Sequence, residues 1–503
     1  MNHISSRSLI LATLLVSFPA ISAAEKPNVV LIMADDMGWG DVGYHGYKDV
    51  LTPNIDRIAK EGVQFSQGYV SASVCGPSRA GLLTGVYQQR MGAGENASAT
   101  GFPDKMPERT RLSGLPTSQS TIAEILRPQG YRCGMIGKWH LGVEEPLRPN
   151  ARGFNFFWGF LNGSHEYTAW EPKFAKKKGK WPIFRNNEML PAQENIYLTD
   201  LFSDRAVGFI KHNTEKPFFL YLAYNAVHHP WQVPDNYLKR TKHLSDNKER
   251  NFFAGMILAM DDGIGRILKT LDEAGIANDT IVIFLSDNGS PRGQGLKPQK
   301  KDTSLVRGGT PMSNPGPHRG FKGDTYEGGT KVPFTIRWPG KIKAGSKYEL
   351  PVSALDLAPT LAARMGIKAP IKGHPFDGVD LLPFLNGEKG DARPHEVLYW
   401  RRDNDYAVRE GDWKLTWNDT SGTMSIKLFN LANDPGEHHD VAQNYSKIAQ
   451  DLQDKFDTWD HAMPNSKPWG GPGNRNRAFA NGNRMDVEKY NTTPPKRSPA
   501  KIR

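Results

Sequence analysis

The chain has 503 residues, a formal net charge of +11 and two cysteines, Cys75 and Cys133. This length can bury a large core, and it predicts one large domain accompanied by a smaller one. No stretch beyond residue 24 approaches the roughly 20 apolar residues that a membrane span needs, so we expect no membrane partner. The surplus of basic residues would attract a polyanion to the surface of the protein. Because no nucleic-acid-binding motif accompanies it, we expect no nucleic-acid partner.

The first residues have the composition of an export signal. Arg7 precedes the apolar run Leu9–Phe18, and the small residues Ser22-Ala23-Ala24 suit a cleavage site. We predict a signal peptide over residues 1–24, with a short hydrophobic N-terminal helix as the alternative. No cysteine follows the apolar run, which argues against a lipid anchor. The expected location of the protein is therefore periplasmic or secreted.

The next 260 or so residues alternate apolar runs with helical segments. Continuous apolar runs, typical of strands buried on both faces, predict strands over 28–34, 131–136, 218–224 and 281–285. Helices are predicted over 52–60, 121–130 and 252–274. The first would have Thr52 as its cap and Pro53 as its first residue, and the second opens with the capping box of Thr121 and Glu124. This alternation indicates an α/β fold with a largely parallel sheet.

A further short helix is expected from Pro77, which suits a first helical position, to Gly85, which can close it. Cys75 would lie at or just before the N-terminus of this helix, where backbone N–H groups favour an anion. Arg79 would follow about one turn later on the same face. A cysteine at such a position is ordinarily a small buried residue or half of a disulfide, so a Cys75–Cys133 bridge is the competing interpretation.

Polar residues follow four of the predicted strands: Asp35 and Asp36, Lys138 and His140, His228, and Asp287 and Asn288. Open α/β sheets bind ligands beyond the carboxyl ends of their strands, so we expect these side chains to lie together. The carboxylate and amide oxygens suit Ca²⁺, or alternatively Mg²⁺, better than zinc. A polyoxyanion pocket would use Arg79, Lys138, His140, His228 and Lys322. The alternative is that the acidic residues cap helices and the basic residues are solvated.

The remaining chain predicts a loop and a second subdomain. Residues 291–318 are polar and rich in Gly and Pro, which predicts a long loop on the substrate side. A strand is predicted over 332–338, a helix over 355–365, and then a small antiparallel sheet with a closing helix over 448–459. We expect a main domain over 25–390, a C-terminal subdomain over 391–463 and a basic tail over 464–503. The tail is either merely solvated or concentrates a polyanion.

The sequence Cys75-Gly76-Pro77-Ser78-Arg79, followed by Leu83-Thr84-Gly85, resembles the signature of the formylglycine-dependent (type I) sulfatases. Further blocks resemble that family in its order, namely 35–36, 137–140, 226–230, 286–289 and 322–329, with 377–380 and 434–436 later. Two residues depart from the usual pattern: Val86 stands where many members have arginine, and Val227 where they usually have proline. The resemblance is to the arylsulfatase and N-acetylgalactosamine-4-sulfatase branch.

The resemblance implies an alkaline-phosphatase-like fold, with a mostly parallel central sheet flanked by helices, and hydrolysis of sulfuric esters. A maturation enzyme would oxidise Cys75 to formylglycine (3-oxoalanine), whose hydrate is the nucleophile. The implied Ca²⁺ ligands are Asp35, Asp36, Asp287, Asn288 and residue 75 itself. Arg79 and Lys138 would stabilise the hydrate, and Lys138, His228 and Lys322 would hold the sulfate. His228, with Lys322, would protonate the leaving oxygen, and His140 would take a proton from the second hydroxyl.

The stretches 152–159 and 162–167 look like the branch that acts on 4-sulfated galactose or N-acetylgalactosamine, which implies a sulfated polysaccharide as substrate. His165, Glu166 and His318 are candidate sugar contacts, with ordinary loop residues as the alternative. Two other functions stay open: a phosphate or phosphonate monoester hydrolase on the same scaffold, and a catalytically silent protein that binds sulfated glycans.

Overall fold

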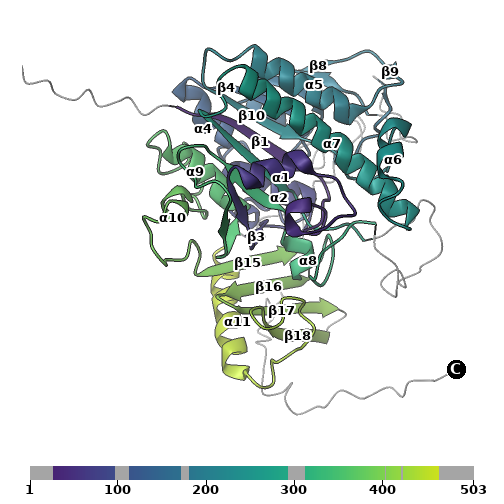
Figure 1. Ribbon diagram of the computed structural model, residues 1–503. Coiled ribbons are helices and arrows are strands. Elements are labelled where there is room, and N and C mark those ends of the chain that lie inside the picture. Colours follow the sequence, from purple (N-terminus) through teal and green to yellow (C-terminus); the bar gives the residue numbers. More distant parts are fainter. Residues whose placement is uncertain are drawn as a thin grey trace, which may run out of the picture.

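Figure 1 shows the computed structural model of the protein, which describes residues 26–96, 113–171, 181–292, 312–402, 404–420 and 423–463. The predicted signal peptide, the predicted tail and most of the predicted substrate-side loop lie outside these residues. Within the described ranges, every helix is too short or too polar to cross a membrane.

The described chain has a central sheet of ten strands in the order β13-β2-β12-β11-β1-β10-β4-β5-β7-β8. Its middle strands are parallel neighbours: β11 (Thr280–Ser286), β1 (Asn28–Ala34), β10 (Phe218–Ala223), β4 (Arg132–Lys138) and β5 (Phe156–Phe160). The outer strands are β12 (Phe334–Arg337), β2 (Val63–Phe65), β13 (Ser346–Tyr348), β7 (Phe184–Arg185) and β8 (Glu188–Met189). The predicted strands are thus confirmed, with shifts of one or two residues at their ends.

Alternate residues of the central strands contact two different helical layers. On β1, Leu31 and Met33 belong to one apolar cluster, while Val30 and Ile32 belong to the other. The first cluster includes residues of α2 (Cys75–Thr84), α4 (Ile122–Leu126) and α9 (Leu357–Ala363). The second includes residues of α1 (Pro53–Lys60), α5 (Leu198–Lys211), α6 (Asp235–Thr241) and α7 (Lys248–Glu273). Because both faces of the sheet are covered, the central strands are continuous apolar runs.

A second, antiparallel sheet follows in the C-terminal part, below the central sheet in Figure 1. It consists of β15 (Val397–Arg402), β16 (Asp405–Glu410), β17 (Trp413–Thr420) and β18 (Thr423–Asn430). Helix α11 (Ser446–His461) packs on it: Phe456 joins the sheet's apolar cluster, and Trp459 stacks on Tyr399 with 4.9 Å between ring centroids. The predicted small sheet with its closing helix is confirmed.

The remaining elements are short. They are the paired strands β3 (Gly68–Tyr69) and β14 (Val352–Ser353), the pair β6 (Ala169–Trp170) and β9 (Gln193–Glu194), and the helices α8 (Glu327–Thr330) and α10 (Leu382–Leu385).

Two local predictions were wrong, and one was confirmed in full. Pro77 is the third residue of α2, not the first; its missing N–H is still harmless there because first-turn N–H groups have no partner within a helix. Thr52 precedes α1 but makes no capping bond, because its hydroxyl oxygen accepts the N–H of Gly43 at 2.7 Å while its hydroxyl donates to Asp56. The capping box of Thr121 and Glu124 forms as predicted.

Candidate active site

The carboxyl ends of four parallel strands bring the predicted polar residues to one edge of the sheet. Asp35 and Asp36 come directly after β1, Lys138 ends β4 with His140 two residues on, His228 lies in the loop after β10, and Asp287 and Asn288 follow β11. Gly137 has φ +106°, and a Cβ on it would lie 1.9 Å from the Ala223 carbonyl oxygen of β10. Only glycine therefore allows β4 to deliver Lys138 at this place.

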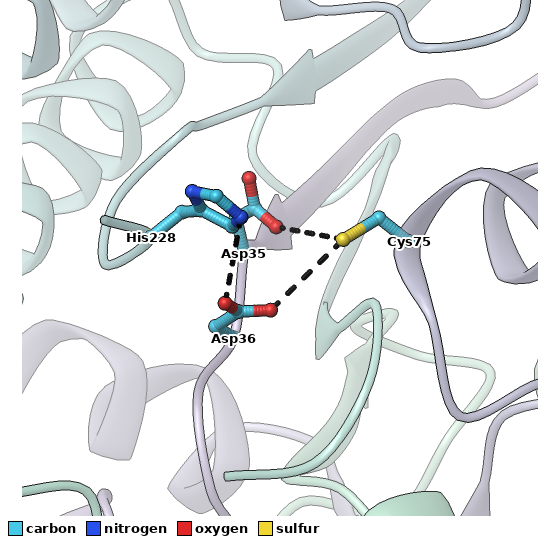
Figure 2. Close-up of side chains that lie close together, drawn as sticks. All are labelled: Asp35, Asp36, Cys75 and His228. Carbon is cyan, nitrogen blue, oxygen red and sulfur yellow. Dashed lines mark hydrogen bonds and ion pairs between the residues drawn. The ribbon is translucent and has the colours of Figure 1, made fainter. Parts of the chain in front are cut away.

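Helix α2 places Cys75 opposite the two aspartates (Figure 2). The Cys75 sulfur lies 3.6 Å from Asp35 Oδ1 and 4.0 Å from Asp36 Oδ1, and the side chain is buried. The next backbone N–H, that of Gly76, donates to the side chain of Asn96, and Gly85 ends the helix in a left-handed conformation. Both cysteines are free, so the alternative of a disulfide between them is excluded.

Arg79, one turn further along α2, links three strand ends. Its guanidinium is fully buried and donates to Asp287 Oδ2 through Nη2 at 2.8 Å and through Nε at 3.0 Å. Its Nη1 donates to the carbonyl oxygen of Lys138, and its Nη2 lies 3.8 Å from Asp35. Burial alone would lower the pKa of Arg79, but the carboxylate of Asp287 raises it above the usual value. A guanidinium held in this way keeps its charge.

The two aspartates after β1 have different partners. Lys138 Nζ lies 2.6 Å from Asp35 Oδ2, whereas Lys322 Nζ lies 2.6 Å from Asp36 Oδ1. Asp36 also accepts a hydrogen bond from Asn288 Nδ2 at 2.8 Å and lies 3.7 Å from His228 Nε2. Despite burial, the charge of Lys322 holds the pKa of Asp36 below its usual value. Asp36 has φ +64°, which is unusual outside glycine and indicates backbone strain at this site.

The acidic cluster fits a divalent cation. Burial and the neighbouring charge of Asp287 raise the pKa of Asp35 to about 7, against the lowering effect of Lys138. The buried side-chain oxygen of Asn288 has no hydrogen-bond partner among the described residues. Asp35, Asp36, Cys75 and His228 each offer one ligand atom, and these atoms lie within 4.8 Å of one another. A divalent ion would relieve the repulsion between carboxylates and would give Asn288 a partner.

The two histidines of the cluster are held neutral. Burial and then the charge of Lys138 lower the pKa of His140 far below its usual value. Its Nδ1 is buried without a partner in the described part of the chain, and its ring packs against Gly163, where a Cβ would lie 2.6 Å from Nε2. Burial lowers the pKa of His228 to about 3, although Asp36 opposes this. His228 Nδ1 lies 2.6 Å from its neighbour's carbonyl oxygen, which leaves Nε2 facing the cluster.

The family described as Sulfatase matches residues 27–367, a range that holds every side chain of this cluster. The chain belongs to the sulfatase family. The family described as N-sulphoglucosamine sulphohydrolase, C-terminal, matches residues 316–461, which include the four-stranded sheet and α11. The predicted family, the alkaline-phosphatase-like fold and the activity as a sulfuric ester hydrolase are thereby confirmed.

Relatives of known name cover most of the sulfatase. It is 33% identical to arylsulfatase A of Homo sapiens over 481 residues, which cover 86% of each chain. It is 30% identical to the N-acetylgalactosamine-6-O-sulfatase of Bacteroides thetaiotaomicron, with 86% of this chain and 93% of that protein covered. The solved structure of Ps i-CgsB in complex with k-i-k-neocarrahexaose superposes with a TM-score of 0.75 at 33% identity, covering 88% of this chain and 94% of that one.

The three candidate sugar contacts differ in their burial and hydrogen bonds. His165 was predicted wrongly: it is buried, and its ring nitrogens lie 2.5 Å and 2.8 Å from the backbone carbonyl oxygens of Glu166 and Trp181, so neither is available to a sugar. Glu166 is half-buried and stays a prediction. His318 is buried with Nδ1 3.1 Å from the Pro435 carbonyl oxygen, and its role as a sugar contact likewise stays a prediction.

Two positioning residues of the sulfatase were missed. The Tyr167 hydroxyl lies 2.5 Å from the Asn225 carbonyl oxygen and 2.9 Å from that of His228, so it holds the loop that carries His228. Arg402, from β15 of the C-terminal sheet, donates to the carbonyl oxygen of Gly323, next to Lys322. Tyr167 lies within a stretch that the sequence singled out, but nothing local marks Arg402, whose partner is 79 residues away.

Replacing Tyr167 with phenylalanine should lower kcat/KM for an aryl sulfate about tenfold, because His228 loses the hydroxyl that holds its loop. The expected loss of stability is about 1 kcal/mol. Tyr237→Phe is the matched control: its hydroxyl donates to Asp200 Oδ1 of α5 at 2.7 Å and not to the backbone of the His228 loop. The measurement is kcat/KM of both variants for the aryl sulfate, and equal values would contradict the positioning role of Tyr167.

Proposed function

We propose that this sulfatase removes sulfate from sulfated galactose or N-acetylgalactosamine units of a polysaccharide, after Cys75 has been oxidised to formylglycine. The observation that carries the proposal is the position of Cys75: it starts a buried helix and faces Asp35, Asp36 and a surrounding set of cationic side chains. This arrangement unites a nucleophile position, a candidate cation site and donors for the oxygens of a sulfate ester.

The environment of Cys75 disfavours an unmodified thiol as the nucleophile. Burial raises the pKa of this thiol to about 12, although Lys138 and Lys322 oppose the shift. At neutral pH it is therefore a thiol, and thiols are poor nucleophiles compared with thiolates. In the formylglycine form, the aldehyde hydrate would supply one hydroxyl to attack sulfur and a second from which the aldehyde re-forms as sulfate leaves.

Asp35, Asp36, Asp287 and the Asn288 side-chain oxygen are the residues that would hold Ca²⁺, together with residue 75. When bound, the cation supplies charge stabilisation to the oxygens of the reacting group. Arg79 keeps Asp287 ionised and oriented through two hydrogen bonds, and it is too deeply buried to reach a sugar. Its role is therefore to arrange the acidic cluster.

Lys138 and Lys322 would hold the sulfate. Each ammonium group lies 2.6 Å from one of the two aspartates that Cys75 faces, Lys138 beside Asp35 and Lys322 beside Asp36. Lys322 is partly exposed and Lys138 is fully buried, so Lys322 is the lysine nearer the entrance. Charge-assisted hydrogen bonds from these groups strengthen as negative charge builds on the sulfate oxygens.

His228 and His140 would move protons. With its Nδ1–H donating to the His229 carbonyl oxygen, His228 carries a proton on Nε2 only as an imidazolium, a form that the charge of a bound sulfate ester favours. It would pass this proton to the sugar oxygen as the S–O bond breaks, with Lys322 beside it. His140, neutral and with a free Nδ1, would accept the proton of the second hydroxyl as sulfate is released.

The choice of substrate draws support from the relatives and from charge. Two named relatives are an N-acetylgalactosamine-6-O-sulfatase and a protein solved with a neocarrahexaose, and the net charge of +11 attracts a polyanion. The sequence favours sulfate at position 4, whereas a named relative acts at position 6. Sulfate release from matched 4- and 6-sulfated oligosaccharides separates the two. Faster turnover of an aryl phosphate than of an aryl sulfate would contradict the whole assignment.

Calcium should stabilise the folded sulfatase. A cation that binds only the folded state raises stability by about 2.7 kcal/mol at 100 times its Kd. We expect removal by a chelator to lower both Tm and activity, and added Ca²⁺ to restore both. Asn288→Leu should remove the Ca²⁺-dependent rise in Tm, whereas Asn96→Leu, at an asparagine that accepts the Gly76 N–H and offers no ligand atom to the cluster, should keep it. A rise in Tm with Zn²⁺ and none with Ca²⁺ would contradict the oxygen-ligand assignment.

A further inference from the structure

A groove at the opposite end of the central sheet has no part in the chemistry above. It has a volume of about 550 Å³ and lies between α5 and the strands β4, β5 and β7. Arg132, on its wall, starts β4, and Lys138 of the active site ends it. At about 3.3 Å per residue, the two ends of this strand are roughly 20 Å apart, so the groove is separate from the active site.

The lining of the groove combines cations with aromatic rings. Arg132, Arg185 and Arg205 come from β4, β7 and α5 and are exposed. The Arg205 guanidinium lies 5.2 Å from the ring centroid of Trp158, which it covers. The rings of Phe156 and Phe209 stack beside it at 6.0 Å and 27°. The groove therefore presents three guanidinium groups over a floor of aromatic side chains, of which Trp158 and Phe209 are buried and Phe156 is half-buried.

The positive charge of this groove is not neutralised by the protein. Among the described residues, Arg132, Arg185 and Arg205 form no ion pair with a carboxylate, and Arg205 lies over the Trp158 ring. Asp204 also lines the groove, but it forms an ion pair with Arg266 on α7. Unpaired guanidinium groups bind oxyanions such as sulfate through two parallel hydrogen bonds.

We propose that this groove, hereafter the arginine groove, is a second binding site for sulfated polysaccharide, remote from the place where sulfate is removed. The identity of the ligand rests on the proposed function, whereas the existence of the site rests on the volume of the groove and its three exposed arginines. A polymer held there brings its other units to the active site at a raised effective concentration. A volume of this size lies within the roughly 300–1,000 Å³ of ordinary ligand sites.

The test compares the triple variant Arg132→Ala, Arg185→Ala, Arg205→Ala with a control that removes the same charge from exposed lysines elsewhere: Lys60→Ala, Lys343→Ala, Lys368→Ala. The arginine variant should raise KM for a sulfated galactan or chondroitin sulfate about tenfold or more and leave KM for a small aryl sulfate unchanged. The lysine control should stay within about twofold of the wild type for both substrates.

Binding to the immobilised polymers is measured in parallel on full-length protein that retains the Cys75 thiol. The arginine variant should lose affinity relative to the lysine control there too, so the groove is tested even if no sulfate is released from the polymer. Equal affinity of the two variants would overturn the proposal, as would equal binding of desulfated polymer by the wild type. If the arginine variant lost as much turnover on the small aryl sulfate as on the polymer, the arginines would be needed for folding and the proposal would be overturned. Dissociation of a dimer by the arginine variant would assign the groove to an interface between copies.

Discussion

Replacing Cys75 with serine should lower kcat for sulfate ester hydrolysis by about 10³-fold or more, the scale seen when an enzyme loses its nucleophile. The serine hydroxyl could still attack sulfur, but it has no second hydroxyl with which to expel the sulfate. The fold should persist, because Cys75 makes only the long contacts of 3.6 Å and 4.0 Å with the aspartates. Initial rates on an aryl sulfate, with Tm measured on the same sample, check both expectations.

Cys133→Ala is the matched control for this experiment. Cys133 is buried in β4, and its sulfur lies 3.8 Å from the Ala123 carbonyl oxygen, away from the acidic cluster. Its loss should lower stability modestly and leave kcat within about twofold, since it removes a small apolar group from the core. Full turnover by Cys75→Ser would refute a mechanism that needs formylglycine.

The second large effect is expected at Lys414 of β17, which joins the C-terminal sheet to the catalytic part. Lys414 Nζ lies 2.9 Å from Glu327 and 3.1 Å from Glu437, and all three side chains are buried. Glu327 begins α8, five residues after Lys322. Burial raises the pKa of Glu437 to about 7 even with Lys414 present. The lysine is therefore the cation that both carboxylates share, while Lys331 lies 3.9 Å from Glu327 alone.

Lys414→Met should lower the free energy of unfolding by about 3–5 kcal/mol, because it keeps the side-chain volume but removes the cation that Glu327 and Glu437 share, leaving Glu327 with Lys331 at 3.9 Å. It should also raise KM, because the loop that carries Lys322 ends at Glu327. Urea unfolding followed by tryptophan fluorescence gives the first quantity. Lys427→Met on the neighbouring strand is the control: its Nζ lies 3.4 Å from the Tyr326 hydroxyl at the surface, and a loss below about 1 kcal/mol is expected. Equal losses in the two variants would contradict the role of Lys414.

The parts of the site that the sequence predicts well are those encoded locally. The strands before Asp35, Lys138 and Asp287 are buried on both faces, so they are continuous apolar runs whose ends are easy to recognise. The parallel topology then brings those ends to one edge, which is why the acidic cluster could be anticipated from spacing alone. The capping box of Thr121 was predicted correctly for the same reason, since both of its bonds are with Glu124, three residues away.

The errors arise where a distant contact competes with a local preference. Helix α2 begins two residues before Pro77, at Cys75, and the side chain of Asn96 takes up the N–H of Gly76 there. His165 has the residue type of a sugar contact, but a carbonyl group from Trp181, 16 residues on, occupies its ring. Arg402 and Lys414 act across the boundary between two sheets. Pairings of this kind depend on tertiary packing, which no local pattern records.

The central claim is that an oxidised side chain at position 75 makes this protein active. The most direct measurement is the occupancy of that position in preparations made with graded amounts of a maturation enzyme, read by mass spectrometry of the peptide that contains it and plotted against the rate of sulfate release by the same samples. We predict a straight line through the origin. A preparation in which every molecule retains the Cys75 thiol and which still releases sulfate at the full rate would contradict the account.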